Sequence, residues 1–177
     1  MDITQNYFEL LRLPQEYFFD KNILSQHYRE LQKQFHPDKY ANQSAADQRL
    51  AVQFAAYINT AYQTLISPVR RAEYMLVLQG EEIDHQSTTV SDGQFLMLQM
   101  EWRESLADIG SLSDLVAAEQ QLEELLAMVS AEAALFESAF YQYYRENNLS
   151  AAKQIVAKLY FVEKKTYKSV IYVKIEI

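Results

Sequence analysis

The sequence predicts an all-α protein, and two observations lead to this fold class. The 177 residues include only three glycines and three prolines, fewer turn-forming residues than a sheet-rich fold of this length needs. Apolar residues also recur three and four positions apart through most of the chain, a spacing that gathers them on one face of a helix. The apolar content of 49% is ordinary for a globular protein, so these helices can bury a core.

The first three predicted helices form a small module. A short helix over residues 6–13 ends at Pro14. A second helix starts after Asp20, a plausible N-cap, and ends near His36, because a residue that precedes proline avoids the α region. A third starts after Ser44 and runs to about Ile66. The expected apolar stripes are Leu24, Tyr28, Leu31 and Phe35 on the second helix, and Leu50, Phe54, Tyr57, Ile58, Ala61 and Leu65 on the third. These stripes predict an antiparallel hairpin.

A polar stretch divides the chain. A fourth helix over residues 69–79 ends at Gly80, a typical residue just past a helix C-terminus. Residues 81–89 are polar and short. We therefore expect one domain over residues 1–80, a linker over 81–89 and a second domain over 90–177.

The second domain is expected to be a three-helix antiparallel bundle. Its first helix is capped by Ser91 or Asp92. Its second helix is opened by Ser111 or Ser113, ends near Asn147-Asn148, and carries an expected apolar stripe of Leu115, Leu122, Leu125, Val129, Leu135, Phe136, Phe140 and Tyr144. Ser150 caps the third helix. The terminal residues 170–177 are β-branched and favour a strand, but a lone strand has no partner in a helical chain. The conformation of this tail stays open.

The charge is distributed unevenly. Residues 1–80 are neutral overall, residues 81–89 carry a net charge of −3, residues 90–147 carry −9, and residues 148–177 carry +4, which gives the total of −8. A chain of this balance is a poor nucleic-acid binder, because neutralising phosphates requires a basic surface. The contrast between a neutral first half and an acidic second half indicates two modules with different partners.

Several classes of protein are excluded or disfavoured. The absence of cysteine excludes disulfides, thiol nucleophiles and cysteine-ligated metals, and it fits a reducing compartment. Residues 1–4 do not form a basic and then apolar stretch, so we expect no secretory leader. The sequence contains no run of about eighteen apolar residues, so we expect no membrane-spanning helix. We expect a cytoplasmic protein. None of the three histidines, His27, His36 and His85, has a nearby set of ligands, so we expect no metal and no cofactor.

The tetrapeptide His36-Pro37-Asp38-Lys39 connects the two helices of the hairpin. Polar residues on a short loop held by rigid helices favour docking over packing. Arg29 and Lys33 are four residues apart and share a face of the preceding helix, with Lys21 and His27 nearby. This face is either a common solvated surface or a docking surface for an acidic partner, and Lys39 would extend the latter.

The helix after Asp92 carries more apolar residues than one buried stripe requires. The cluster from Phe95 to Trp102 covers more than one face. Much of it must be core. The remainder, with Glu101, Glu104 and Asp108 alongside, would form an exposed patch for a partner protein.

These motifs carry a specific resemblance. Residues 7–10, 31–39 and 58–65 resemble a J-domain, the module that contains the His-Pro-Asp motif. Three further stretches are similar to the HscB family of iron–sulfur co-chaperones: Pro68 with Arg71-Ala72-Glu73-Tyr74, Phe95-Leu96-Met97, and Lys158-Leu159-Tyr160-Phe161-Val162. The resemblance covers the chain to about Lys165.

The resemblance implies an L-shaped protein in which a J-domain is joined to a three-helix bundle. It implies a co-chaperone, not an enzyme, that brings an IscU-type scaffold to an HscA-type chaperone and stimulates the chaperone ATPase. The chaperone-binding residues would be His36, Pro37, Asp38, Lys39, Arg29 and Lys33. The scaffold-binding residues would be Leu96, Met97, Met100, Glu101, Glu104, Asp108 and Phe161.

Three alternatives remain at this point. The first is a general J-domain co-chaperone whose bundle handles unfolded clients. The second is an all-α enzyme that uses an acidic pair such as Glu101 and Glu104, although no histidine ligand accompanies them. The third is a helical adaptor in which the His-Pro-Asp sequence is accidental.

Overall fold

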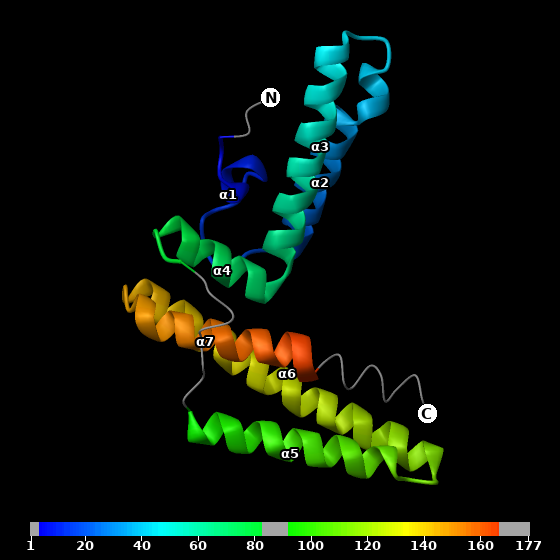
Figure 1. Cartoon of the computed structure of the whole chain (residues 1–177), viewed down its shortest axis with the longest axis vertical. Coiled ribbons are helices and arrows are strands. Elements are labelled where there is room, and N and C mark those ends of the chain that lie inside the picture. The colour runs from blue at the N-terminus through cyan, green and yellow to red at the C-terminus, as the bar shows by residue number, and fades with distance from the viewer. Residues whose placement is uncertain (1–3, 83–91, 167–177) are drawn as a thin grey trace. The chain divides into compact units, whose positions relative to one another are not determined.

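The structure is a computed structural model that describes residues 4–82 and 92–166. All regular elements in those ranges are helical, which confirms the all-α prediction (Figure 1). The chain divides into two compact units, Met1–Met75 and Leu76–Ile177. The expected boundaries at residues 80 and 90 and the L shape stay predictions. His85, most of the expected linker and the terminal strand over 170–177 lie outside the described residues.

Helix α1 (Tyr7–Leu10) is shorter than predicted. Asn6 and Glu9 form a reciprocal capping box at its start. At its end, Arg12 adopts a left-handed φ of 51°, and the Leu13 amide donates to the Phe8 carbonyl at 2.8 Å. This Schellman-type closure ends the helix. The prediction that the helix extends to Leu13 and is stopped by Pro14 was therefore wrong.

Helices α2 (Lys21–Phe35) and α3 (Ala45–Ile66) form the predicted hairpin and lie side by side (Figure 1). Asp20 and Ser44 cap them as expected. Two aromatic pairs join the helices: Tyr28 stacks on Tyr62 with centroids 4.1 Å apart, and Phe35 meets Phe54 edge-on at 4.6 Å. The Phe35 contact lies at the end of α2 from which the connecting loop leaves.

Leu50 was wrongly assigned to the buried stripe of α3. Its side chain is exposed, whereas Ala51 is fully buried. The buried residues of α3 are Ala51, Phe54, Ile58, Ala61 and Leu65. They follow spacings of three and four, and Leu50 lies one position outside that series.

Helix α4 (Pro68–Leu78) begins one residue earlier than predicted, because proline suits the first helical position. Gly80, with φ of 83°, closes it: the amides of Gly80 and Glu81 donate to the carbonyls of Val77 and Leu76. Arg71 is buried and donates to the Leu65 carbonyl at 2.9 Å. Its guanidinium also lies 4.5 Å from the centre of the Tyr17 ring. The first unit thus places an arginine inside its aromatic core.

Tyr74 joins α4 to α1. Its hydroxyl accepts the Tyr7 amide at 2.9 Å, and the two rings stack at 4.3 Å. Burial, outweighing this hydrogen bond, raises the pKa of Tyr74. The contact satisfies one of the amides that a helix N-terminus leaves free.

The second unit contains α5 (Gly93–Gly110), α6 (Leu115–Arg145) and α7 (Leu149–Phe161), followed by a π-helical turn, η2 (Val162–Thr166). Asp92 caps α5, as one of the two candidates predicted. The serine caps expected for the other helices were wrong. Asp114 caps α6 by accepting two backbone amides, and Asn148 caps α7.

The bundle core comes from one stripe of each helix. It includes Phe95, Trp102, Ile109, Leu122, Leu125, Val129, Phe136, Phe140, Ile155, Val156, Leu159 and Val162. Leu115 and Leu135 were predicted to join the α6 stripe but are exposed. Leu135 directly precedes the buried Phe136, and one position turns a helical side chain by about 100°. Because Phe136 faces the core, the side chain of Leu135 points away from it.

Candidate functional site

The loop between α2 and α3 is compact. His36 ends α2 with an extended backbone (ψ of 129°), as a residue before proline requires. Residues Pro37–Tyr40 then form one 3₁₀ turn, η1. The Nδ1 atom of His36 accepts the Asp38 amide at 3.3 Å. The loop predicted from Pro37 is therefore an ordered turn with its own cap, and we call residues 36–40 the HPD loop.

The HPD loop presents charge to solvent. The Asp38 side chain is 90% exposed, and its Oδ2 lies 3.5 Å from His36 Nδ1. Pro37 is half-buried, and His36 and Lys39 are exposed. The far side of the loop is held by Gln48 of α3, whose amide group donates to the Ala41 and Gln43 carbonyls. The fold fixes the backbone of the loop while its charged groups stay accessible.

Four of the six predicted chaperone-binding residues line one open groove of about 640 Å³. Its lining is Arg29, Gln32, Lys33, His36 and Lys39, and we call it the basic groove. Pro37 and Asp38 lie between His36 and Lys39 in the chain but are not part of the lining. The sequence reasoning missed Gln32, although its position three residues after Arg29 was a usable signal.

His27 lies apart from the basic groove. Sequence reasoning placed it near that surface, but its ring is half-buried and its Nδ1 is 2.7 Å from the Leu11 carbonyl. A carbonyl can only accept, so Nδ1 carries the hydrogen in this contact. His27 holds the end of α1.

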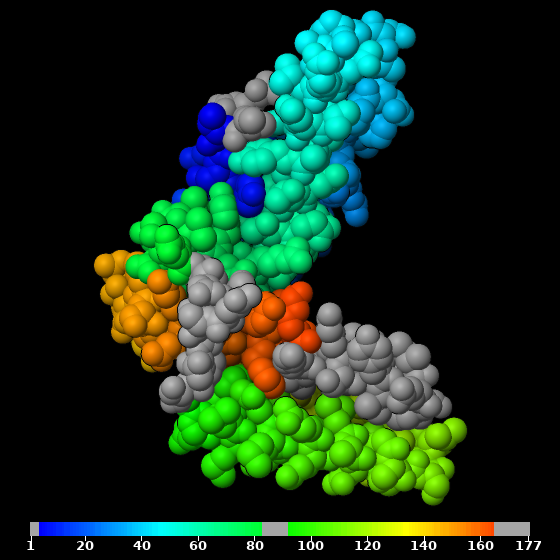
Figure 2. All heavy atoms as spheres, viewed as in Figure 1, coloured from blue at the N-terminus to red at the C-terminus, as the bar shows by residue number. Residues whose placement is uncertain are grey.

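The cluster on α5 divides between core and surface. Phe95 and Trp102 are buried, whereas Leu96, Met97 and Met100 are 50%, 64% and 60% exposed. Glu101, Glu104 and Asp108 are also exposed. At about 100° per residue, these six exposed side chains fall within about 140° of the helix circumference. We call them the apolar-acidic surface, and Figure 2 shows α5, in green, along an outer edge of the second unit.

Phe161 comes from a different helix. It lies at the end of α7, is half-buried, and meets the Phe95 ring edge-on with centroids 5.6 Å apart. Phe95 directly precedes Leu96. Phe95, a core residue of α5, therefore links Phe161 on α7 to the predicted scaffold-binding residues on α5.

The two glutamates proposed as catalytic residues in the enzyme alternative, Glu101 and Glu104 on α5, are exposed to solvent. Within residues 4–82 and 92–166, no group of three or more His, Cys, Asp or Glu side chains is placed to hold a metal ion. Among the same residues, no helix combines the length and apolarity needed to cross a membrane.

Comparison with known proteins follows the division into two units. A DnaJ domain family model matches residues 6–74, and a model described as the HSCB C-terminal oligomerisation domain matches residues 91–166. A co-chaperone protein HscB homolog of Shewanella woodyi is 44% identical over 159 residues, which are 90% of this chain and 91% of that protein. The chain belongs to the HscB family of co-chaperones. It is therefore a J-domain co-chaperone of iron–sulfur cluster assembly.

Other HscB proteins agree. The HscB homolog of Shewanella oneidensis is 48% identical over 122 residues, 69% of this chain and 70% of that protein. The structure is similar to the chaperone HscB from Vibrio cholerae, with a TM-score of 0.84, 39% identity and coverage of 97% and 99% of the two chains. It is also similar to human co-chaperone HscB, with a TM-score of 0.86, 26% identity and coverage of 100% and 86%. The relatives are named as co-chaperones, and those names describe no catalytic activity.

Proposed function

We propose that this HscB-family protein stimulates the ATPase of an HscA-type chaperone and delivers an IscU-type scaffold protein to it. The observation that carries the proposal is the HPD loop beside the basic groove, inside the segment that matches a DnaJ domain. The cytoplasm is the proposed location. Neither a nucleic acid nor a membrane surface is a proposed partner, because the net charge of −8 disfavours contact with anionic surfaces.

The chaperone arm of the proposal uses charge and rigidity. Arg29, Lys33 and Lys39 would meet an acidic surface of the chaperone, and complementary charge speeds encounter and fixes register. Asp38 would pair with a basic group of the chaperone. Because the His36 imidazole holds the Asp38 amide, the carboxylate is presented on an ordered turn, and little conformational entropy is lost on binding.

The scaffold arm uses the apolar-acidic surface. Three large apolar side chains exposed within two helical turns are unusual on a surface that binds nothing. An apolar helix face flanked by carboxylates suits a shallow apolar surface with a basic rim on a folded partner.

The test measures the ATPase rate of the cognate HscA-type chaperone with this protein, with and without its IscU-type scaffold. Asp38→Asn should abolish stimulation while the protein stays folded, because an exposed surface change alters the free energy of unfolding by less than about 0.5 kcal/mol. Met97→Ser should keep the stimulation seen without scaffold and lose the extra stimulation that scaffold adds.

The chain offers a matched control for the second arm. Met128 lies on α6, is 57% exposed and is outside the apolar-acidic surface. Met128→Ser should behave like the unchanged protein. Stimulation that survives Asp38→Asn would reject the HPD loop as the chaperone contact, and equal loss in Met97→Ser and Met128→Ser would reject the apolar-acidic surface.

The DnaJ match over residues 6–74 would by itself also suit a general J-domain co-chaperone, but the HSCB C-terminal match over residues 91–166 favours the iron–sulfur role. The two candidates differ in the client. The proposed function requires binding to folded scaffold, with a denatured protein competing poorly. A general co-chaperone would show the reverse preference.

A further inference from the structure

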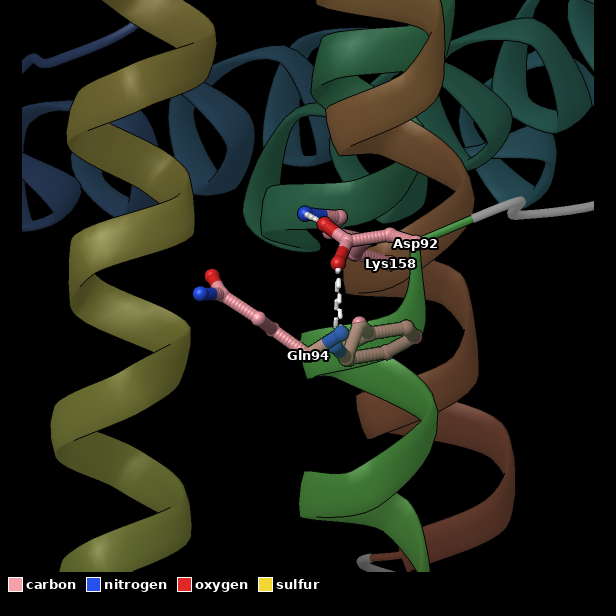
Figure 3. A network of polar contacts seen from close by, with 4 residues as sticks. Asp92, Gln94 and Lys158 are labelled. Carbon is pink, nitrogen blue, oxygen red and sulfur yellow. Dashed lines mark hydrogen bonds and ion pairs between the residues drawn. The ribbon is translucent and has the colours of Figure 1, made fainter.

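One lysine side chain ties α5 to α7. Lys158 of α7 is only 15% exposed, and its Nζ lies 2.5 Å from Oδ2 of Asp92. Figure 3 shows this contact at the start of α5, with Asp92 between Lys158 and the first turn of that helix. A largely buried ammonium needs an opposite charge to offset its lost hydration. Asp92 supplies that charge.

The same carboxylate also begins α5. Oδ1 of Asp92 accepts the amides of Gln94 and Phe95 at 3.0 and 3.1 Å. The two oxygens therefore have separate tasks, since one caps α5 and the other holds α7. The hydrogen bond from Lys158, followed by that from the Phe95 amide, lowers the pKa of Asp92. Asp92 is thus ionised at neutral pH.

Lys158 also contacts the aromatic residues beneath the proposed scaffold surface. Its Nζ lies 5.5 Å from the centre of the Phe95 ring and 5.4 Å from that of Phe136. Phe95 in turn meets Phe161. Because Lys158 and Phe161 are three residues apart on α7, they share a helix face, and both touch Phe95.

We infer that Lys158 is a positioning residue for scaffold binding, acting through Asp92 and Phe95 to hold the start of α5 against Phe161. The inference rests on the proposed function. Leu96 and Met97 follow Phe95 directly on α5, whereas Phe161 belongs to α7. A partner that contacts both helices at once requires a fixed offset between them. An ion pair and a cap on one carboxylate join α5 and α7 at a fixed point, and a shift of one helix along the other would break them.

The test is scaffold binding by the full-length protein, measured by calorimetry, together with the scaffold concentration that gives half-maximal ATPase stimulation. Lys158→Met keeps the apolar stem and removes the charge. It should weaken scaffold binding roughly tenfold. The rate at saturating scaffold, and the stimulation without scaffold, should stay unchanged. This split separates positioning from a general loss of fold.

Lys153 provides the matched control. It lies on the same helix and forms an ion pair with Glu81. Lys153→Met makes the same chemical change away from α5 and should leave scaffold affinity within about twofold. Lys158→Arg keeps the charge and should recover most of the affinity lost in Lys158→Met.

Asp92→Asn keeps the inference testable if Lys158→Met unfolds. Asparagine is as good an N-cap as aspartate, so this change removes the charge but keeps the cap. It should weaken scaffold binding about as much as Lys158→Met, and the double variant should be no weaker than either single variant. Wild-type affinity in Lys158→Met or in Asp92→Asn would overturn the inference. If the unchanged protein failed to bind scaffold, the proposed function would fall, and the inference with it.

Discussion

Asp92 contributes to stability through its charge as well as through its cap. Its carboxylate accepts from Lys158 and from two amides of α5, and the Lys158 hydrogen bond is the largest cause of its lowered pKa. A carboxyl whose pKa is lower in the folded state than in the unfolded chain stabilises the fold above the unfolded value, here 3.8. That contribution is lost as the pH falls through the folded-state value.

We therefore expect Asp92→Asn to unfold at lower urea concentration than the unchanged protein near neutral pH, and the gap to close as the pH falls below 3.8. Urea unfolding followed by circular dichroism from about pH 7 to about pH 3 measures this difference. Asp114→Asn is the matched control, because Asp114 caps α6 in the same way and forms no ion pair among the described residues. It should show a smaller gap. A gap for Asp92→Asn that is constant with pH would reject the charge as its source.

Caps also show what the sequence could and could not predict at the level of single residues. Asp20 and Ser44 were predicted correctly, because each is a good cap that directly precedes its helix. At the start of α6 and α7 several good caps lie close together. Ser111, Ser113 and Asp114 compete for one helix, and Asn148 and Ser150 for the other. The choice depends on where the preceding helix ends, which tertiary packing decides.

At the scale of elements, the basic groove belongs mainly to α2. Arg29 and Lys33 lie one turn apart on its exposed side, and Lys39 extends the charge onto the HPD loop. Exposed charges of this kind act on encounter more than on the stability of a complex. Salt screens them over a distance of about 10 Å at 0.1 M ionic strength.

Exchanging Arg29 and Lys33 together for glutamine should raise the concentration of this protein needed for half-maximal chaperone stimulation by roughly tenfold at low salt, because two steering charges are lost. The difference should shrink to about twofold near 0.5 M salt. Chaperone ATPase titrations at both salt concentrations measure it. Arg49→Gln on α3, which lines a separate groove, should have little effect at either. A loss that did not depend on salt would point to direct contacts in place of steering.

The helices were easier to predict than the faces they present. Leu24 and Leu31 of α2 are buried as predicted. Leu50 of α3 and Leu115 and Leu135 of α6 were predicted to be buried but are exposed. Leu50 and Leu135 lie one position outside the buried series of α3 and α6. Periodicity gives the direction of a stripe, but which of two adjacent apolar residues is buried depends on the neighbouring helix. Likewise, the spacing of the α5 residues predicted an exposed patch, whereas the contacts of Lys158 with α5 and α6 join distant parts of the sequence and left no local signal.

At the scale of the whole molecule, the proposed function depends on two surfaces carried by one chain. The basic groove lies in the first unit, and the apolar-acidic surface lies in the second. A chain that binds chaperone and scaffold together raises the local concentration of scaffold near the chaperone, to about the millimolar range for short linkers. Neither surface alone provides this gain.

Two variants that each lack one of the two binding surfaces should therefore not complement each other when they are mixed. Asp38→Asn keeps the scaffold surface, and Met97→Ser keeps the chaperone surface. In an equimolar mixture, each protein binds one partner, and no chain bridges them. We expect the mixture to give the scaffold-independent stimulation of Met97→Ser and none of the additional stimulation that scaffold brings to the unchanged protein. The measurement is chaperone ATPase against scaffold concentration. Full recovery in the mixture would show that the scaffold reaches the chaperone without being carried, and that the two surfaces act independently.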